Sequence, residues 1–259
     1  MTAGPGPWWD TTNERSVFEP VDWIRHCEQR SGRPAPSLPP AGVQLVLRDE
    51  FAHTLDRFGV DSDDFTRAGH PFAIVDAPPG PVVVAWSAKG SSAAGGLEEM
   101  IALGVRRVVV VGSAGALTED HRIGDVVVAT RARRDDGVSH HYQPAAPYAE
   151  ASATLTPRLV GSLSTAGVEV STGAIWSITA YFRQTPSRLA AFRDEGCIAV
   201  ANETAAAFSI GAYRGVDVAA VCVLGDSIAR GRFDTSGTTD ARTVTAMVDA
   251  AIEAVVDER

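Results

Sequence analysis

The chain has 259 residues, of which 45% are apolar, and it carries a formal net charge of −9 at pH 7. This length fits one large α/β domain or two small ones, of which we favour one, and the apolar share is enough to bury a full core. The acidic balance, without a segregated basic patch, argues against nucleic acid and anionic membranes as partners, because both would repel such a surface.

The cysteines and the lengths of the apolar runs indicate in which cellular compartment the protein is found. Cys27, Cys197 and Cys222 are too few and too widely spaced for a disulfide framework or a metal cluster, so we expect free thiols in a reducing environment. The sequence has no apolar stretch of about 18 residues, and residues 1–9 have neither the basic region nor the apolar core of a signal peptide. We therefore expect a cytoplasmic protein without a membrane segment.

Residues 1–40 are predicted to form an extension ahead of a domain that covers 41–259. Residues 1–16 are polar and rich in glycine and proline, yet include Trp8 and Trp9, which could dock on a neighbouring subunit. Residues 18–30 have a helical pattern with a proline in the first turn, and a proline-rich linker follows over 33–40.

Strand and helix patterns alternate through the rest of the chain. Strands are predicted at 43–47, 72–75, 82–86, 108–111, 123–129, 168–176, 197–201 and 216–224. Helices are predicted at 48–58, 95–103, 155–166, 187–193, 203–214 and 240–256, with 72–86 forming a hairpin and 131–142 a polar loop. This alternation specifies a three-layer α/β sandwich around a central, mostly parallel mixed sheet.

The valine run 108–111 is typical of a strand buried on both faces, and Gly112-Ser113-Ala114-Gly115 follows it. Small residues at the carboxyl end of a buried strand let backbone amides approach a ligand, although a plain strand and turn would explain the pattern equally well. The third glycine of a dinucleotide fingerprint is missing, so a nicotinamide enzyme is a poor fit.

The polar loop contains the adjacent histidines His140 and His141. Adjacent side chains point to different sides, and no third ligand is suitably spaced, so we expect no metal site.

Five segments in a particular order carry a resemblance to a known family. They are Val108–Gly115, Ile123–Val126, Arg134–Tyr142, Val200–Phe208 and Leu224–Ser227. With these segments the chain resembles the nucleoside phosphorylase and nucleosidase superfamily, from about residue 43 to its end. The resemblance implies a glycosyltransferase that cleaves a purine-type nucleoside with phosphate as co-substrate, giving free base and ribose 1-phosphate. It also implies no further cofactor and a homo-oligomer, either a dimer or a hexamer.

The resemblance assigns the catalytic acid to Asp226, which would protonate or hydrogen-bond the purine N7. A carboxylic acid can stabilise the leaving base only if a dry site raises its pKa, and the apolar run before Asp226 suits that need. The alternative is an aspartate that caps the next turn. Glu203 matches the residue that binds the ribose hydroxyls, although a first-turn glutamate favoured by the helix dipole is the simpler interpretation without the family.

The resemblance also suggests a base pocket. Trp176 and Tyr181-Phe182 lie where the family holds the base, and Arg183-Gln184 could contact base edges or an anion. Without the resemblance, Arg183 and Gln184 could equally well be ordinary surface residues.

Several family positions are altered. Where the family has Glu-Met-Glu, this chain has Ala201-Asn202-Glu203, so Asn202 and Glu203 remain as the residues at the ribose. Where the family's phosphorylases have a phosphate-binding arginine, this chain has Val110. The arginine-containing phosphate loop is replaced by residues 47–50, and a Gly-x-Gly turn by Ala88-Lys89-Gly90.

Phosphate is doubly charged near neutral pH, so the loss of charge-assisted contacts to arginine should weaken its binding by roughly a few kcal/mol unless other cations compensate. Lys89, Arg48 and Arg183 are the candidates, with Ser113 and the amides around Gly112 and Gly90 beside the nucleophile.

Three hypotheses therefore stand. The first is phosphorolysis as described above. The second is a nucleosidase that uses water, with Asp49 or Glu50 as the general base. The third is a nucleoside-binding or repurposed member of the superfamily that does not cleave the glycosidic bond.

Overall fold

The computed structural model describes residues 15–78 and 80–256. The predicted docking of Trp8 and Trp9 lies outside these residues. Within the described chain, no helix is both long enough and apolar enough to cross a membrane.

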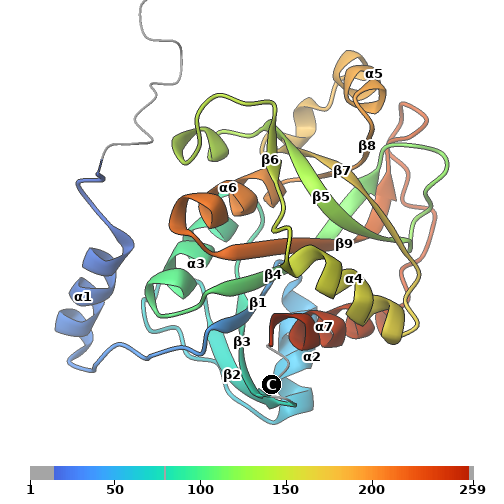
Figure 1. Cartoon of the computed structure of the whole chain (residues 1–259). Helices are drawn as coiled ribbons and strands as arrows, with labels where there is room; N and C mark the ends of the chain where they lie inside the picture. The colour runs from blue at the N-terminus through green and yellow to red at the C-terminus, as the bar shows by residue number, and fades with distance from the viewer. Residues whose placement is uncertain (1–14, 79, 257–259) are drawn as a thin grey trace, which may run out of the picture.

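The order of elements follows the alternation expected from the sequence (Figure 1). The strands are β1 (Ala41–Leu45), β2 (Phe72–Ala77), β3 (Gly80–Trp86), β4 (Arg107–Ala116), β5 (Val126–Asp135), β6 (Tyr148–Glu150), β7 (Val170–Ile178), β8 (Cys197–Ala201) and β9 (Asp217–Ser227). The α-helices are α1 (Pro20–Ser31), α2 (Arg48–Phe58), α3 (Ser91–Ala102), α4 (Leu155–Thr165), α5 (Pro186–Asp194), α6 (Thr204–Arg214) and α7 (Ala241–Val255). Two short 3₁₀ helices, η1 (Ser139–His141) and η2 (Tyr181–Arg183), complete the described elements.

The described strands form one mixed sheet of nine strands, in the order β2-β3-β1-β4-β8-β7-β5-β6, with β9 paired to both β4 and β5. Because β4, β8, β7, β5 and β9 each pair with the next and β9 returns to β4, these strands close into a ring. Parallel pairs such as β1–β4 and antiparallel pairs such as β2–β3 coexist, which confirms the predicted mixed α/β fold.

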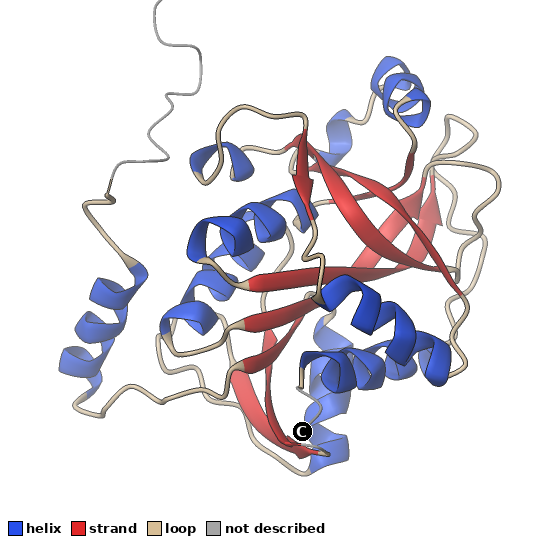
Figure 2. Cartoon of the chain, in the orientation of Figure 1, coloured by secondary structure: helices blue, strands red, loops and turns tan. Residues whose placement is uncertain are grey.

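Helices cover both faces of the sheet (Figure 2). Residues of α1, α3 and α6 pack in one apolar core, and residues of α2, α4 and α7 pack in a second core across the sheet. The four valines of β4 are at most 3% exposed, because they lie between these two layers. The predicted three-layer sandwich is thereby confirmed.

In β4 and β5, the strand continues through residues that were expected to form a turn or a loop. The expected turn at Gly112–Gly115 is part of β4, which pairs with β9 as far as Ala116. Likewise, the first part of the expected polar loop 131–142 is the end of β5, paired with β7 as far as Asp135. Both expectations were wrong because pairing with a neighbouring strand outweighs the low strand propensity of glycine, serine and charged residues.

The pairing of β4 with β9 is interrupted by a bulge. Ala114 pairs with Leu224 and Gly115 pairs with Asp226, so Gly225 is the extra residue of β9. Asp226 therefore lies within β9, rather than after the strand as expected, and the bulge sets the direction of its side chain.

Candidate active site

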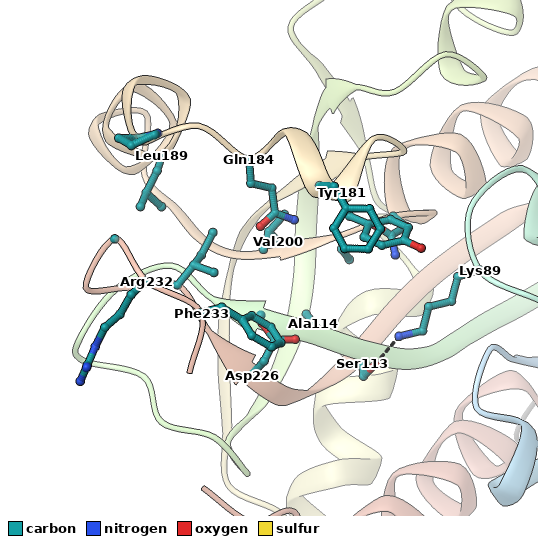
Figure 3. A pocket seen from close by; sticks show the side chains of 17 residues that line it. Lys89, Ser113, Ala114, Tyr181, Gln184, Leu189, Val200, Asp226, Arg232 and Phe233 are labelled. Carbon is teal, nitrogen blue, oxygen red and sulfur yellow. Dashed lines mark hydrogen bonds between the residues drawn. The ribbon is translucent and has the colours of Figure 1, made fainter. Parts of the chain in front are cut away.

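A cavity of about 810 Å³ opens where β4, β8 and β9 carry small or polar residues (Figure 3). Its lining includes Lys89, Ser113, Gly115, Tyr181, Phe182, Gln184, Leu189, Val200, Asn202, Asp226, Arg232 and Phe233. The cavity thus brings together segments that are distant in the sequence, as expected for a ligand site in an α/β protein.

One end of the cavity holds a lysine and a serine. Lys89 follows β3 and precedes Gly90, the N-cap of α3, whose φ of +73° favours glycine. Gln44 on the adjacent β1 fixes this loop, since its Nε2 donates to Ser87 Oγ at 2.7 Å. In this position Lys89 Nζ donates to Ser113 Oγ of β4 at 2.8 Å, as Figure 3 shows. A cation and a hydroxyl so placed can bind an anion.

Glu203 lies directly behind this pair. It is the N-cap of α6, is 2% exposed, and its Oε2 accepts a hydrogen bond of 3.4 Å from the Gly90 N–H. Burial raises the pKa of the Glu203 carboxyl, while the Gly90 N–H and the charge of Lys89 act in the opposite direction. The carboxyl passes close to Gly112 of β4, where an added Cβ would lie 3.4 Å from Glu203 Oε1.

Asp226 faces the cavity from β9, and its Oδ1 lies over the backbone of Gly115. Burial raises the pKa of the Asp226 carboxyl, and the charge of Lys89 partly offsets this. A carboxyl with a raised pKa keeps its proton to higher pH, so Asp226 is suited to act as a general acid.

Aromatic side chains surround the mouth of the cavity. Tyr181 and Phe182 come from η2, and Phe233 comes from the segment between β9 and α7. Phe182 is 89% exposed and Phe233 is 72% exposed, although both are large apolar side chains. Flat apolar faces next to Asp226 and the Gln184 amide suit a planar heterocycle.

Several predicted site residues share this cavity, and others do not. Lys89, Ser113, Phe182, Asn202 and Asp226 all line it. The predicted Glu203, Gly90 and Gly112 lie immediately behind that lining, as described above.

Trp176 lies behind the wall rather than in the cavity, which corrects the expectation that its ring contacts a base. It is fully buried, donates from Nε1 to Asp135 Oδ2 at 2.9 Å and packs against Phe192. In a strand successive side chains point to opposite faces, and the register of β7 directs this one into the core.

The remaining cationic and acidic candidates also lie outside the cavity lining. Arg48 stacks over the Trp86 ring at 5.3 Å, and Arg183 is an exposed residue of η2 that does not line the cavity. Asp49 is exposed on α2, and Glu50 accepts a hydrogen bond of 3.3 Å from Thr245 of α7. Because α2 packs with α7 in the core across the sheet, neither acidic residue lines the cavity as a base would.

His140 and His141 lie in η1, and the described part of the chain contains no group of three histidine, cysteine or acidic residues placed to hold a metal. Sequence reasoning missed Arg232 and Phe233, which line the cavity from an irregular segment. The available signal was a large aromatic residue in a polar stretch shortly after Asp226.

The family model described as "Phosphorylase superfamily" matches residues 42–257. A guanosine phosphorylase of Halorubrum lacusprofundi is 31% identical over 144 residues, covering 54% of this chain and 58% of that protein. A DeoD-type purine nucleoside phosphorylase of Bacillus cytotoxicus is 25% identical over 156 residues, covering 60% of this chain and 66% of that protein. The matches thus span only 58% to 66% of these relatives' lengths.

A similar solved structure is that of the purine nucleoside phosphorylase of Toxoplasma gondii in complex with immucillin-H. It has a TM-score of 0.75 and 17% identity, and the match covers 85% of this chain and 91% of that one. At this identity the likeness establishes the fold.

Proposed function

The chain belongs to the phosphorylase superfamily, and from that membership we propose that it cleaves the N-glycosidic bond of a purine-type nucleoside by phosphorolysis. One observation carries the proposal. The cavity combines a carboxyl of raised pKa, Asp226, with the Lys89–Ser113 pair, and Glu203 is buried behind them.

In this proposal a phosphate oxygen attacks C1′ of the sugar while the bond between C1′ and the base nitrogen breaks. The electron pair of that bond passes into the base, and Asp226 donates its proton there, so the base leaves neutral. Lys89 and Ser113 hold the phosphate by charge and hydrogen bonding. Glu203, with Asn202 beside it, accepts hydrogen bonds from the ribose hydroxyls. The products are free base and ribose 1-phosphate.

A second candidate is hydrolysis, and the distribution of cations favours it. Among the described residues of the cavity lining, the basic side chains are Lys89 and Arg232, and Arg48 and Arg183 do not join them. A single lysine at the Ser113 end is a weaker phosphate site than a pair of arginines. Dependence on phosphate separates the two candidates.

The test is chromatographic detection of free base from a panel of purine and pyrimidine nucleosides, with and without phosphate. We expect base release only with phosphate, and a kcat lower by about 100-fold or more in Asp226→Asn, the usual contribution of a general acid. Asp217→Asn, at the opposite and exposed end of β9, is the matched control and should retain the parent rate.

Release of free base without phosphate would contradict phosphorolysis and would identify hydrolysis as the reaction. Absence of release from every nucleoside, with a nucleoside still raising the melting temperature, would contradict catalysis and leave a binding function.

A further inference from the structure

Two helices begin at the candidate site. Gly90, next to Lys89, is the N-cap of α3, and Glu203 is the N-cap of α6. The hydrogen bond from Gly90 N–H to Glu203 joins the two helix starts directly. The relative position of α3 and α6 therefore decides how Lys89 lies with respect to Glu203.

Further along the two helices, a half-buried ion pair joins them again. Arg214, the last residue of α6, donates from Nε and Nη2 to the two carboxylate oxygens of Glu98 in α3, at 2.9 and 3.0 Å. Glu98 is only 8% exposed. A two-point contact between a planar guanidinium and a carboxylate fixes orientation as well as distance.

Helix α1 connects to both helices at this point. Arg214 Nη1 donates to Glu19 Oε2 at 2.9 Å, and Trp23 Nε1 donates to Glu99 Oε1 of α3 at 3.2 Å. Ile24 and Cys27 of α1 are buried in the same core as α3 and α6. Figure 1 shows α1 at the left of the molecule, on the same side as α3 and α6.

Helix α1 is itself well specified. Glu19 and Asp22 form a capping box at its start, Pro20 occupies the first turn, and Gly32 ends it at a φ of +69°. A helix with such defined ends presents Glu19 and Trp23 in a constant geometry. It lies before residues 42–257, which match the family model.

We propose that α1 is a strap that holds α3 and α6 together, and that Arg214 is the positioning residue through which it sets the distance between Lys89 and Glu203. The inference rests on the proposed function for its kinetic consequence. Helices transmit small displacements along their length because their backbone hydrogen bonds make them stiff, so movement at Glu98 and Arg214 reaches Gly90 and Glu203.

The test is the double variant Glu19→Gln with Trp23→Phe in the full-length protein. Glutamine keeps an acceptor for the helix cap but removes the charge opposite Arg214, and phenylalanine keeps an apolar ring but removes the donor to Glu99. The control is Arg25→Gln, which breaks an exposed ion pair with Asp22 on the same helix.

Two readouts are needed. In the double variant we expect faster amide hydrogen exchange at residues 87–92 and a KM for phosphate raised about threefold to tenfold, with kcat changed less. Arg25→Gln should match the parent in both. A lower melting temperature with unchanged exchange at 87–92 and unchanged KM would overturn the inference, because α1 would then only stabilise the fold.

The exchange measurement decides the inference even if the parent releases no base, an outcome that counts against the proposed function alone. If the double variant does not fold, the single variant Glu19→Gln is tested by the same two readouts.

Discussion

At the scale of single residues, Gly115 sets the position of the candidate acid. An added Cβ at Gly115 would overlap Oδ1 of Asp226 and approach Val200 Cγ1 to 3.2 Å. Gly115→Ala should therefore displace the Asp226 carboxyl and lower base release by about 100-fold, as small misplacements of catalytic groups do. The measurement is kcat with the best nucleoside of the panel.

Gly225→Ala provides the comparison, because a Cβ there meets only Ser113 Cβ, at an ordinary 3.8 Å. Equal losses in the two variants would contradict the explanation through Asp226 and would indicate general damage to the paired strands.

Some of the residues named in the sequence analysis lie together in the structure, while their roles in binding and catalysis stay predictions. Lys89, Ser113 and Asp226 were each expected at the site, and the structure brings them to one cavity. Trp176 was misplaced because a residue pattern does not reveal which face of a strand its side chain takes. Phe233 was missed because irregular segments have no periodicity from which a direction can be inferred.

At the scale of elements, the start of α3 depends on an unusual backbone. Gly90 has φ +73° and ψ −132°, a combination that side chains with a Cβ rarely adopt, although an added Cβ would meet nothing closer than Thr179 Cγ2 at 3.8 Å. Gly90→Ala should thus act through strain alone and lower the free energy of unfolding by about 1–3 kcal/mol. Denaturant unfolding measures this.

The matching substitution is Gly137→Ala, where no atom lies within 4 Å of the added Cβ and φ is not positive. It should change the free energy of unfolding by less than about 0.5 kcal/mol. A Gly90→Ala variant as stable as Gly137→Ala would contradict the strained conformation.

Element types were predictable because valine-rich runs and helical spacing dominate most segments of this chain. Their ends were less predictable, since β4 and β5 continue through residues that prefer other structures in isolation. The register shift that makes Gly225 a bulge depends on the pairing of two strands about a hundred residues apart, which no local pattern contains.

At the scale of the whole molecule, the closed ring of strands and the two helical layers explain why one cavity collects residues from β4, β8 and β9. The order of strand and helix segments predicted the layers, but not the pairing of β9 with both β4 and β5. The separate extension over residues 1–40, the homo-oligomer and the cytoplasmic location stay predictions.

Burial of charge in this site also makes the stability of the molecule depend on pH. Burial raises the pKa of Glu203 above its ordinary value of 4.5, so the folded chain binds this proton more tightly than the unfolded chain does. The stabilising contribution is complete below pH 4.5 and is lost as the pH rises through the folded pKa. Each unit of difference between the two pKa values corresponds to about 1.4 kcal/mol.

Glu203→Gln removes this titration while its amide oxygen can still accept the Gly90 N–H. The melting temperature of the variant relative to the parent should therefore increase as the pH is raised from 4.5 toward 8, because only the parent must place a charge in the core. Glu150→Gln, at an exposed carboxyl, should instead follow the parent at every pH. If the melting temperatures of Glu203→Gln and the parent changed with pH in the same way, the pKa of Glu203 would be the same in the folded and unfolded chains. The environment of Glu203 would then be far more polar than its 2% exposure indicates.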